Sequence, residues 1–177
     1  GITDAVCMIQ LPFWTPLAIK LRERFGWLLV YDCMDDHAGF STNHSAMAAQ
    51  EDLLLRECDL ALATSKVLQE RAESKAKRTL LLPNAVDFEW FSGASNADRP
   101  DDLPVSEGPV IGYVGAISDW FDFDLLKPAV EAHPEWTFVF IGSTWGADRH
   151  EQLARKPNVH FTGEKPYEEI PVYLGAF

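Results

Sequence analysis

Short apolar runs alternate with segments of helical periodicity along most of the chain. The first half contains four apolar runs of strand length, at 5–10, 27–31, 59–64 and 79–82. Apolar residues recur with helical spacing between them, at 17–25, 47–56 and 67–76. Continuous apolar runs are typical of strands buried on both faces, and strict alternation with helices is typical of parallel βαβ architecture. The first half is therefore predicted to form one parallel sheet.

The pattern changes between residues 92 and 108, where Ser, Asp, Pro, Gly and Asn dominate without apolar periodicity. Alternation then resumes, with predicted strands at 110–115, 137–141 and 158–161 and predicted helices at 123–133, 149–155 and 167–177. Two βα series around one linker predict an α/β fold of two incomplete Rossmann-like parallel-sheet units joined by a hinge. The predicted domains are residues 1–91 and 109–177, with a linker at 92–108.

Composition and charge narrow the classes of function. The 177 residues are 47% hydrophobic and 24% charged, which is the composition of a globular protein with a core. The formal net charge of -12 disfavours nucleic acid and anionic lipid as partners, because both are bound by positive faces. The basic cluster Lys75-Ala-Lys77-Arg78 is short and is interpreted as a solvated helix end. No apolar run approaches the length of about twenty residues that spans a membrane.

The three cysteines, Cys7, Cys33 and Cys58, form no CxxC pair and lie in apolar surroundings. They are predicted to be reduced core residues of a cytoplasmic protein, so a zinc site is not expected. A peripheral position at the inner face of the membrane stays open for the full-length protein.

Glycines follow three successive strands of the second series. The motifs are Gly112-Tyr-Val-Gly115, Gly142-Ser-Thr144 and Gly163-Glu-Lys-Pro166. Ligands of open α/β sheets bind outside the carboxyl ends of the strands, and glycine lets backbone N–H groups approach a phosphate closely. The motifs are expected to line one crevice for a phosphate-containing ligand. Three ordinary βα turns, in which glycine only relieves a tight bend, are the alternative.

An acidic cluster follows the second predicted strand. Its members are Asp32, Asp35, Asp36 and His37. If the groups converge, they could act as a general base, as ligands of a divalent metal or as a phospho-acceptor pocket. Acidic residues at a strand end also cap the following helix, so a structural role is an equal alternative.

Two tryptophans, Trp120 and Trp145, fall in loops of the expected crevice and are candidates for stacking on a sugar ring. The other tryptophans are expected to fill the core, and His44 and His160 to be structural or surface residues. The sequence contains no Ser-His-Asp order and no metal-binding pair of histidines at helical spacing.

The segment Leu82-Pro-Asn-Ala-Val-Asp-Phe-Glu-Trp-Phe91 closes the first series directly before the linker. Other segments accompany it in a fixed order: Tyr31–Asp36, Cys58–Ser65, Val110–Gly115, Phe138–Gly142 and Asn158–Gly163. Together they resemble the retaining GT-B glycosyltransferases of the family 4 type, in a branch whose members build polysaccharides. Those relatives carry Pro-Asn-Gly-Val-Asp where this chain has Ala85 in place of the glycine. The resemblance covers nearly the whole chain.

The resemblance implies sugar transfer from a UDP- or GDP-linked donor to a glycan or lipid-linked acceptor in an interdomain cleft, with retention of configuration. No cofactor or obligatory metal is implied besides the nucleotide-sugar co-substrate. The donor is expected on the second unit. The implied donor-binding residues are Gly115, Ala116, Ser118, Asp119, Gly142, Ser143, Thr144, Gly163, Glu164 and Lys165. Asp32 or Asp35 falls near the place where many relatives present a His to the reacting sugar, and both are candidate catalytic residues.

Besides Ala85, the chain departs from this family in three respects. Many relatives have an Arg directly after the glycine that matches Gly115 and a Lys shortly after it, which together neutralise the leaving diphosphate. This chain has Ala116 there, followed by Asp119 and Asp122. The Glu pair that holds the donor sugar and the ribose would lie beyond Phe177. The first strands and the glycine loop of the family's first domain are missing as well. The chain is therefore expected to be an internal fragment that is inactive by itself.

Two other functions stay open. A receiver-like signalling domain would use Asp32, Asp35 and Asp36 as an acidic Mg²⁺ pocket, which requires them to converge beside a further Asp at a neighbouring strand end. Asp59 begins a strand instead of ending one, which counts against this hypothesis. A nucleotide- or carbohydrate-binding module without catalysis would bind the donor without turnover.

Overall fold

The computed structural model describes residues 2–39, 46–93, 98–118, 120–145 and 150–177. The chain forms two compact units, Gly1–Ala85 and Val86–Phe177. Each unit contains one parallel sheet. Among the described residues, no helix has the length and apolar character needed to span a bilayer.

The first unit alternates strands and helices, as predicted. Its described strands are β1 (Val6–Ile9), β2 (Leu28–Cys33), β3 (Leu60–Ala63) and β4 (Thr79–Leu81). Its described helices are α1 (Thr15–Phe25), α2 (Ala46–Glu57) and α3 (Lys66–Glu73), with 3₁₀ turns η1 (Pro12–Trp14) and η2 (His37–Gly39). The strands are parallel and lie in the order β1-β2-β3-β4.

Local sequence signals fix the ends of the helices. Pro16 occupies the first turn of α1, where its missing N–H costs nothing. Gly26 ends this helix with a φ of 71°, and its N–H donates to the Arg22 carbonyl oxygen at 2.8 Å. Ser65 caps α3 as predicted, because its side chain accepts a hydrogen bond from the Leu68 N–H at 3.3 Å.

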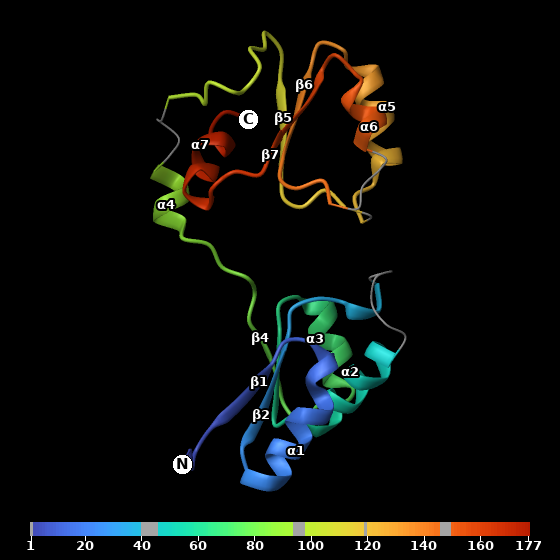
Figure 1. The fold of residues 1–177 in the computed structure, drawn as a ribbon, viewed down its shortest axis with the longest axis vertical. Helices are drawn as coiled ribbons and strands as arrows, with labels where there is room; N and C mark the ends of the chain where they lie inside the picture. Colours follow the sequence, from blue (N-terminus) through green and yellow to red (C-terminus); the bar gives the residue numbers. More distant parts are fainter. Residues whose placement is uncertain (1, 40–45, 94–97, 119, 146–149) are drawn as a thin grey trace. The chain divides into compact units, whose positions relative to one another are not determined.

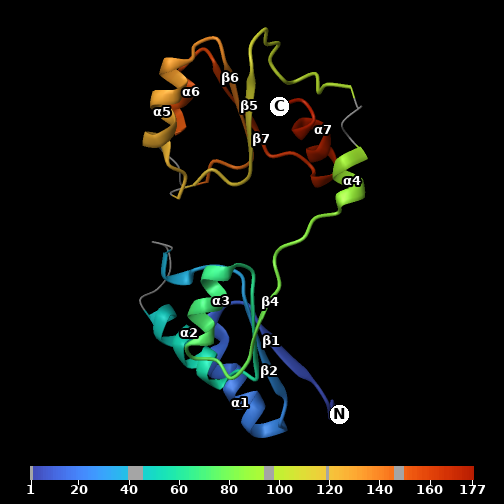
Figure 2. The same ribbon diagram turned by 180° about the vertical axis from the view of Figure 1, so that it is seen from behind.

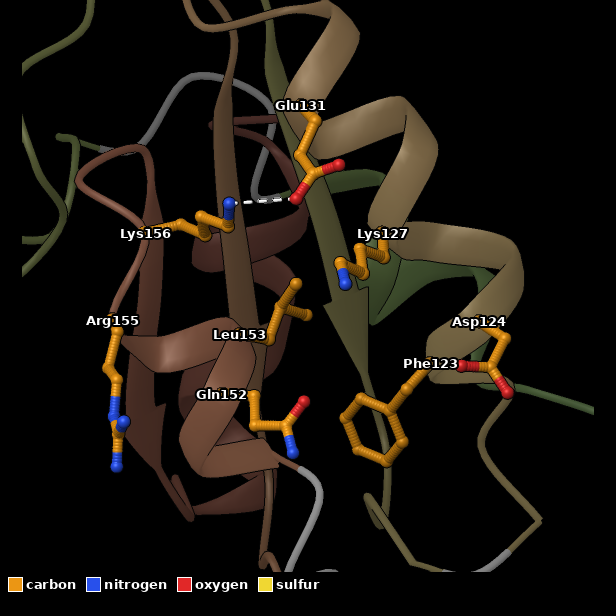
Figure 3. Close-up of a pocket in the computed structure, with 8 residues that line it drawn as sticks. All are labelled: Phe123, Asp124, Lys127, Glu131, Gln152, Leu153, Arg155 and Lys156. Carbon is orange, nitrogen blue, oxygen red and sulfur yellow. Dashed lines mark hydrogen bonds and ion pairs between the residues drawn. The ribbon is translucent and has the colours of Figure 1, made fainter.

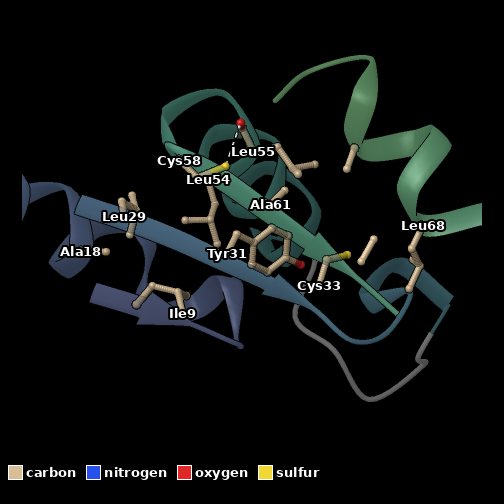
Figure 4. Packing of buried hydrophobic residues seen from close by; sticks show 12 residues of the cluster. Ile9, Ala18, Leu29, Tyr31, Cys33, Leu54, Leu55, Cys58, Ala61 and Leu68 are labelled. Carbon is tan, nitrogen blue, oxygen red and sulfur yellow. Dashed lines mark hydrogen bonds between the residues drawn. The ribbon is translucent and has the colours of Figure 1, made fainter. Parts of the chain in front are cut away.

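The helices α1, α2 and α3 all lie on one face of the first sheet (Figure 1). Alternate residues of β2 are buried against them, and the Tyr31 ring lies in the middle of this core (Figure 4). The opposite face carries exposed apolar side chains, among them Val6, Met8, Leu28 and Leu80. The expectation that these strands are buried on both faces is therefore wrong for the first sheet, because no described element of the unit packs on that face.

The second unit repeats the alternation. Its described strands are β5 (Val110–Val114), β6 (Thr137–Ile141) and β7 (Val159–Gly163), parallel and in the order β5-β6-β7. Its described helices are α4 (Phe88–Gly93), α5 (Phe123–Ala132), α6 (His150–Ala154) and α7 (Ile170–Leu174), with a 3₁₀ turn η4 (Tyr167–Glu169) before α7. The predicted α/β fold with two separate parallel sheets is confirmed.

Both faces of the second sheet are covered. The helices α5 and α6 lie on one face and α7 on the other (Figures 1 and 2). Alternate residues of β6 point to the two sides: Phe138 and Phe140 belong to the core under α5 and α6, whereas Val139 and Ile141 contact the α7 side. Leu103 joins the α7-side core, so part of the stretch expected to be a linker is packed against the sheet.

Helix α4 is an element that the sequence pattern does not predict. It lies against α7 (Figure 2), and the rings of Phe91 and Tyr167 are in edge contact with centroids 5.7 Å apart. These residues therefore pack with the second unit, which begins at Val86. The domain boundaries expected from the sequence, with a linker at 92–108, stay a prediction for the whole protein.

Candidate functional site

The glycine motifs of the second unit lie side by side at one edge of its sheet. The Gly115 N–H donates to the Ile141 carbonyl oxygen at 2.9 Å, and the Gly142 N–H donates to the Gly163 carbonyl oxygen at 2.9 Å. Parallel strands place their carboxyl ends at the same edge, and these bonds extend the ladder into the loops. The structure thus brings the motifs after β5, β6 and β7 together.

The loop after β5 is held by its own contacts. The Ile117 N–H donates to the Ser143 carbonyl oxygen at 2.8 Å, and the Tyr113 hydroxyl donates to the Ala116 carbonyl oxygen at 3.0 Å. Ile117 is fully buried and Ser118 is 4% exposed. The backbone of this loop is therefore fixed beside the loop after β6, and the Ser118 side chain lies in the interior.

Close approach of two backbones requires glycine at Gly142. Its φ is 141°, and a Cβ there would lie 2.0 Å from the Gly115 carbonyl oxygen. Gly115 itself has a φ of 153°, and a Cβ there would lie 3.0 Å from the Tyr113 hydroxyl oxygen. Residues with a Cβ adopt such φ values only with strain. The two glycines therefore let the loops after β5 and β6 touch.

Several backbone N–H groups of these loops donate no hydrogen bond to any residue that the structure describes. Within the part of the chain that the structure describes, the N–H groups of Ala116, Ser143 and Thr144 donate to no other group. Ser143 and Thr144 are half-buried, where an N–H normally finds an acceptor in the protein, in water or in a ligand. N–H donors clustered beside glycines are a common way to bind phosphate. This edge can therefore accept an anionic ligand.

The other residues expected at the donor site differ in their surroundings. Gly163 and Glu164 are exposed at the end of β7, whereas Asp119 lies outside the described residues. Trp120 and Trp145 are 55% and 74% exposed, so a ligand has access to both side chains.

Lys165 is paired within the second unit. Its Nζ lies 2.5 Å from Asp102 Oδ2, and the Tyr173 hydroxyl donates to the other oxygen of this carboxylate at 2.8 Å. The hydrogen bond from Lys165 holds the pKa of Asp102 below its usual range, and the same bond raises the pKa of Lys165. Asp102 carries no signal in the sequence, since it lies in the stretch interpreted as a linker.

Replacing Asp102 by Asn should weaken the second unit in a pH-dependent way. Because the pKa of Asp102 is lowered on folding, its ionised form stabilises the fold above the unfolded value of about 3.9. This stabilisation is lost as the pH falls through the lower folded value. We expect Asp102→Asn to cost on the order of 1 kcal/mol or less at neutral pH, since the carboxylate is 42% exposed. Denaturant unfolding at neutral pH and at about pH 3 should show the difference shrinking in acid.

The neighbouring exposed carboxylate of Asp101 supplies a matched control. Asp101→Asn removes the same charge from the same stretch, and no described group pairs with this side chain. Its stability should stay close to that of the unchanged protein at both pH values. Equal losses for the two variants, or a loss for Asp102→Asn that does not change with pH, would contradict the role of the ion pair.

The acidic cluster of the first unit lies at the carboxyl end of β2. The Gln10 side-chain amide donates to Asp32 Oδ2 at 3.1 Å, and the Thr64 hydroxyl donates to the Met34 carbonyl oxygen at 2.8 Å. Asp32 is half-buried and Asp35 is exposed. The two candidate catalytic carboxylates thus lie at the edge where β1 and β3 also end.

Among the residues that the structure describes, the acidic side chains do not converge on a metal site. Asp36 pairs with Arg71 at 2.5 Å. Asp59, at the beginning of β3, pairs with Arg22 at 3.1 Å and accepts a hydrogen bond from the Leu29 N–H at 2.9 Å. Within the described ranges, no group of three or more His, Cys, Asp or Glu side chains is placed to hold a metal ion. A receiver-like pocket, which needs converging carboxylates, is therefore not supported.

The structure contains a buried carboxylate behind the acidic cluster that the sequence analysis did not predict. Glu51 of α2 is 1% exposed, accepts a hydrogen bond from the Tyr31 hydroxyl at 2.7 Å and pairs with Arg71. Burial, reinforced by the hydrogen bond to Glu51, raises the pKa of Tyr31, and burial also raises the pKa of the Cys33 thiol. The sequence does contain a signal, because Glu51 shares the apolar stripe of its helix with Leu54 and a charge there needs partners.

A hollow of about 420 Å³ lies between α5 and α6 (Figure 3). Three cations line it, Lys127, Arg155 and Lys156, together with the carboxylates of Asp124 and Glu131. Lys156 forms an ion pair with Glu131, with its Nζ 2.8 Å from Glu131 Oε1. The hollow lies in the helical layer and contains no residue of the glycine motifs, so it is separate from the site at the strand ends.

Comparison with known proteins shows which proteins this chain resembles in sequence and in fold. No family model matches the chain. The chain is 28% identical over 170 residues to TuaH of Bacillus subtilis (strain 168), which is named for a glycosyltransferase role in teichuronic acid biosynthesis. The crystal structure of Anabaena Alr3699/HepE in complex with UDP and glucose matches with a TM-score of 0.75 and 21% identity, over 98% of this chain and 50% of that one. The chain has the fold of a GT-B glycosyltransferase.

A second Alr3699/HepE structure, in complex with UDP-glucose, matches this GT-B fold with a TM-score of 0.69 and 19% identity, over 96% of this chain and 50% of that one. The match to TuaH covers 87% of this chain and 43% of TuaH, so the chain spans about half the length of these relatives. The resemblance stated from the sequence is confirmed as a similarity in sequence to the glycosyltransferase TuaH and in fold to Alr3699/HepE. The two parallel sheets correspond to the Rossmann-like halves of the GT-B fold.

Proposed function

We propose that the protein is a glycosyltransferase and that its second unit binds the nucleotide diphosphate of a sugar donor. The observation that carries the proposal is the edge formed by the loops after β5 and β6. Gly115 and Gly142 bring these loops into contact there, and the N–H groups of Ala116, Ser143 and Thr144 have no described partner. The similarity to TuaH and the UDP complexes of Alr3699/HepE support this choice of reaction and ligand.

The proposed chemistry follows from where charge develops in the reaction. Breaking the glycosidic bond leaves negative charge on the departing diphosphate, and fixed N–H donors stabilise such charge without reorganising. No Arg or Lys follows Gly115 directly, and Lys165 is already paired with Asp102. We expect the backbone N–H groups to carry much of this stabilisation.

The finer parts of the proposal extend the resemblance. The donor is a UDP- or GDP-sugar, transfer proceeds with retention, and the acceptor is a glycan or a lipid-linked glycan. Asp32 and Asp35 of the first unit are the proposed catalytic carboxylates. Use of nucleotide sugars for polysaccharide assembly fits a cytoplasmic location, with peripheral association at the inner membrane face as an extension of it.

Ligand binding and transfer by the intact protein test the proposal. A nucleotide sugar at about 100 times its Kd should stabilise the fold by about 2.7 kcal/mol, which is seen as a higher Tm. A labelled sugar should then move from the donor to an acceptor glycan. Failure of every UDP- and GDP-sugar to raise Tm would sink the donor assignment, whereas a raised Tm without any transfer would favour a binding module.

A further inference from the structure

We propose that Glu51 and Arg71 are positioning residues that hold the acidic loop of residues 34–36 and thereby orient Asp35. The reaction that this orientation serves is the proposed glycosyl transfer, so this part of the inference rests on the proposed function. The loop contact itself is a property of the fold. It can be measured without any substrate.

The inference starts from a carboxylate in the core of the first unit. Glu51 is 1% exposed on α2, and one of its oxygens accepts a hydrogen bond from the Tyr31 hydroxyl at 2.7 Å. The other oxygen pairs with Arg71 of α3. Apolar residues of similar volume in place of a buried ion pair often leave stability unchanged or increased. A gain in stability therefore does not explain why the Glu51–Arg71 pair is present. The contact of Arg71 with Asp36 offers an explanation.

Arg71 connects the buried carboxylate to the acidic loop. One guanidinium nitrogen bonds to Glu51, while the other lies 2.5 Å from Asp36 Oδ1. The Arg71 side chain is 33% exposed and that of Asp36 is 60% exposed, so the contact runs from the core to the surface. The guanidinium is planar and rigid, and a plane held at both ends fixes the direction of each bond. Asp36 is thereby anchored to the core.

Two further contacts hold the loop backbone. The Met34 carbonyl oxygen accepts a hydrogen bond from the Thr64 hydroxyl at 2.8 Å. The Cys33 Sγ lies 4.0 Å from the Asp35 carbonyl oxygen and 4.0 Å from Glu51 Oε1. The buried carboxylate thus reaches the loop through Arg71, and the Cys33 thiol lies between Glu51 and the Asp35 backbone.

The contacts leave one carboxylate of the loop available. Asp32 accepts from Gln10 and Asp36 pairs with Arg71, whereas the exposed Asp35 carboxylate has no partner among the described residues. A held backbone with a free carboxylate is the arrangement that a reacting group needs, since small misplacements of such a group cost much of the rate. The geometry therefore favours Asp35 over Asp32 as the group that meets the substrate.

Hydrogen exchange in the intact protein tests whether the network holds the loop. Arg71→Lys keeps a cation beside Glu51 but lacks the second nitrogen of the fork, and Asp36→Asn weakens the exposed end only. Lys75→Gln is the matched control, because Lys75 pairs with Asp52 of α2 and does not contact the loop. The Gly39 and Thr64 N–H groups donate to the Asp36 and Cys33 carbonyl oxygens at 2.9 and 3.3 Å, so their exchange reports how firmly the loop is held. We expect this exchange to rise about tenfold in the first two variants and to stay unchanged in the control. Unchanged exchange in Arg71→Lys, or an equal rise in Lys75→Gln, would overturn the inference.

Steady-state kinetics test whether the held loop serves the reaction. In Arg71→Lys and Asp36→Asn, kcat should fall by about tenfold or more. The KM for the nucleotide sugar should stay within about twofold, because the donor is proposed to bind the second unit. Retained kcat would overturn the positioning role while the proposed function stands. If the unchanged protein transfers no sugar, the proposed function fails, and the loop then has no catalytic role. Hydrogen exchange still decides whether Glu51 and Arg71 hold the loop.

Discussion

Replacing Gly142 by Ala is expected to cost the second unit about 3–5 kcal/mol of stability, because backbone strain of about 1–3 kcal/mol adds to an overpacking cost of similar size. The new Cβ would lie 2.0 Å from the Gly115 carbonyl oxygen and 2.7 Å from its carbonyl carbon. Both are backbone atoms of the neighbouring loop, so neither can turn away. Chemical unfolding of the intact protein, followed at β5 and β6 by hydrogen exchange, measures the loss.

Gly163→Ala is the matched control for this prediction. Gly163 lies at the same edge with a φ of 76°, and a Cβ there meets no atom within 4 Å. Its replacement should cost only the conformational strain of about 1–2 kcal/mol. The excess loss in Gly142→Ala then reports the contact between the two loops. Equal losses in the two variants would show that this contact does not decide the fold of the edge.

Replacing Arg71 by Ala should destabilise the first unit by about 3–5 kcal/mol, because it leaves the Glu51 carboxylate buried without its cation. The Tyr31 hydroxyl would stay as a partner of Glu51, and one neutral donor does not replace a charged one. Denaturant unfolding of the intact protein, followed at β2 and β3 by hydrogen exchange, measures the change.

Two further variants show whether the buried charge is the cause. Lys75→Ala breaks a surface ion pair between α2 and the turn that follows α3, and it should change stability little. The double variant Glu51→Gln, Arg71→Met leaves no charge in the core and should recover most of the stability that Arg71→Ala loses. A loss in Arg71→Ala no larger than in Lys75→Ala, or no recovery in the double variant, would contradict this explanation.

Most of the fold follows from the sequence pattern, and the exceptions have physical causes. Every predicted strand is present, since each is a short apolar run bounded by turn residues. Helix α4 escapes prediction because six residues are too few to show helical periodicity. Asp87 caps the helix, since its Oδ1 accepts a hydrogen bond from the Trp90 N–H at 3.0 Å, and Phe91 packs on Tyr167. An apolar run also does not tell which face of its strand is covered, and the exposed side of the first sheet shows this at Val6 and Leu28.

The site is predictable to the extent that it depends on backbone geometry. Strand ends followed by glycine locate the edge where Gly115 and Gly142 meet. The pattern of apolar and polar positions does not predict the partners of charged side chains, because these partners come from distant segments of the sequence. Lys165 pairs with Asp102, 63 residues away in the sequence. Glu51 could have been recognised as a charge on an apolar helix stripe, although nothing in the sequence names Arg71 as its cation.

Hydrogen exchange of the intact protein with and without UDP tests the central claim most directly, because it shows where the nucleotide binds. We predict that UDP slows exchange at residues 115–118 and 142–144 and leaves the hollow between α5 and α6 unchanged. Binding of UDP without protection of these two loops, or with protection confined to α5 and α6, would contradict the placement of the donor site.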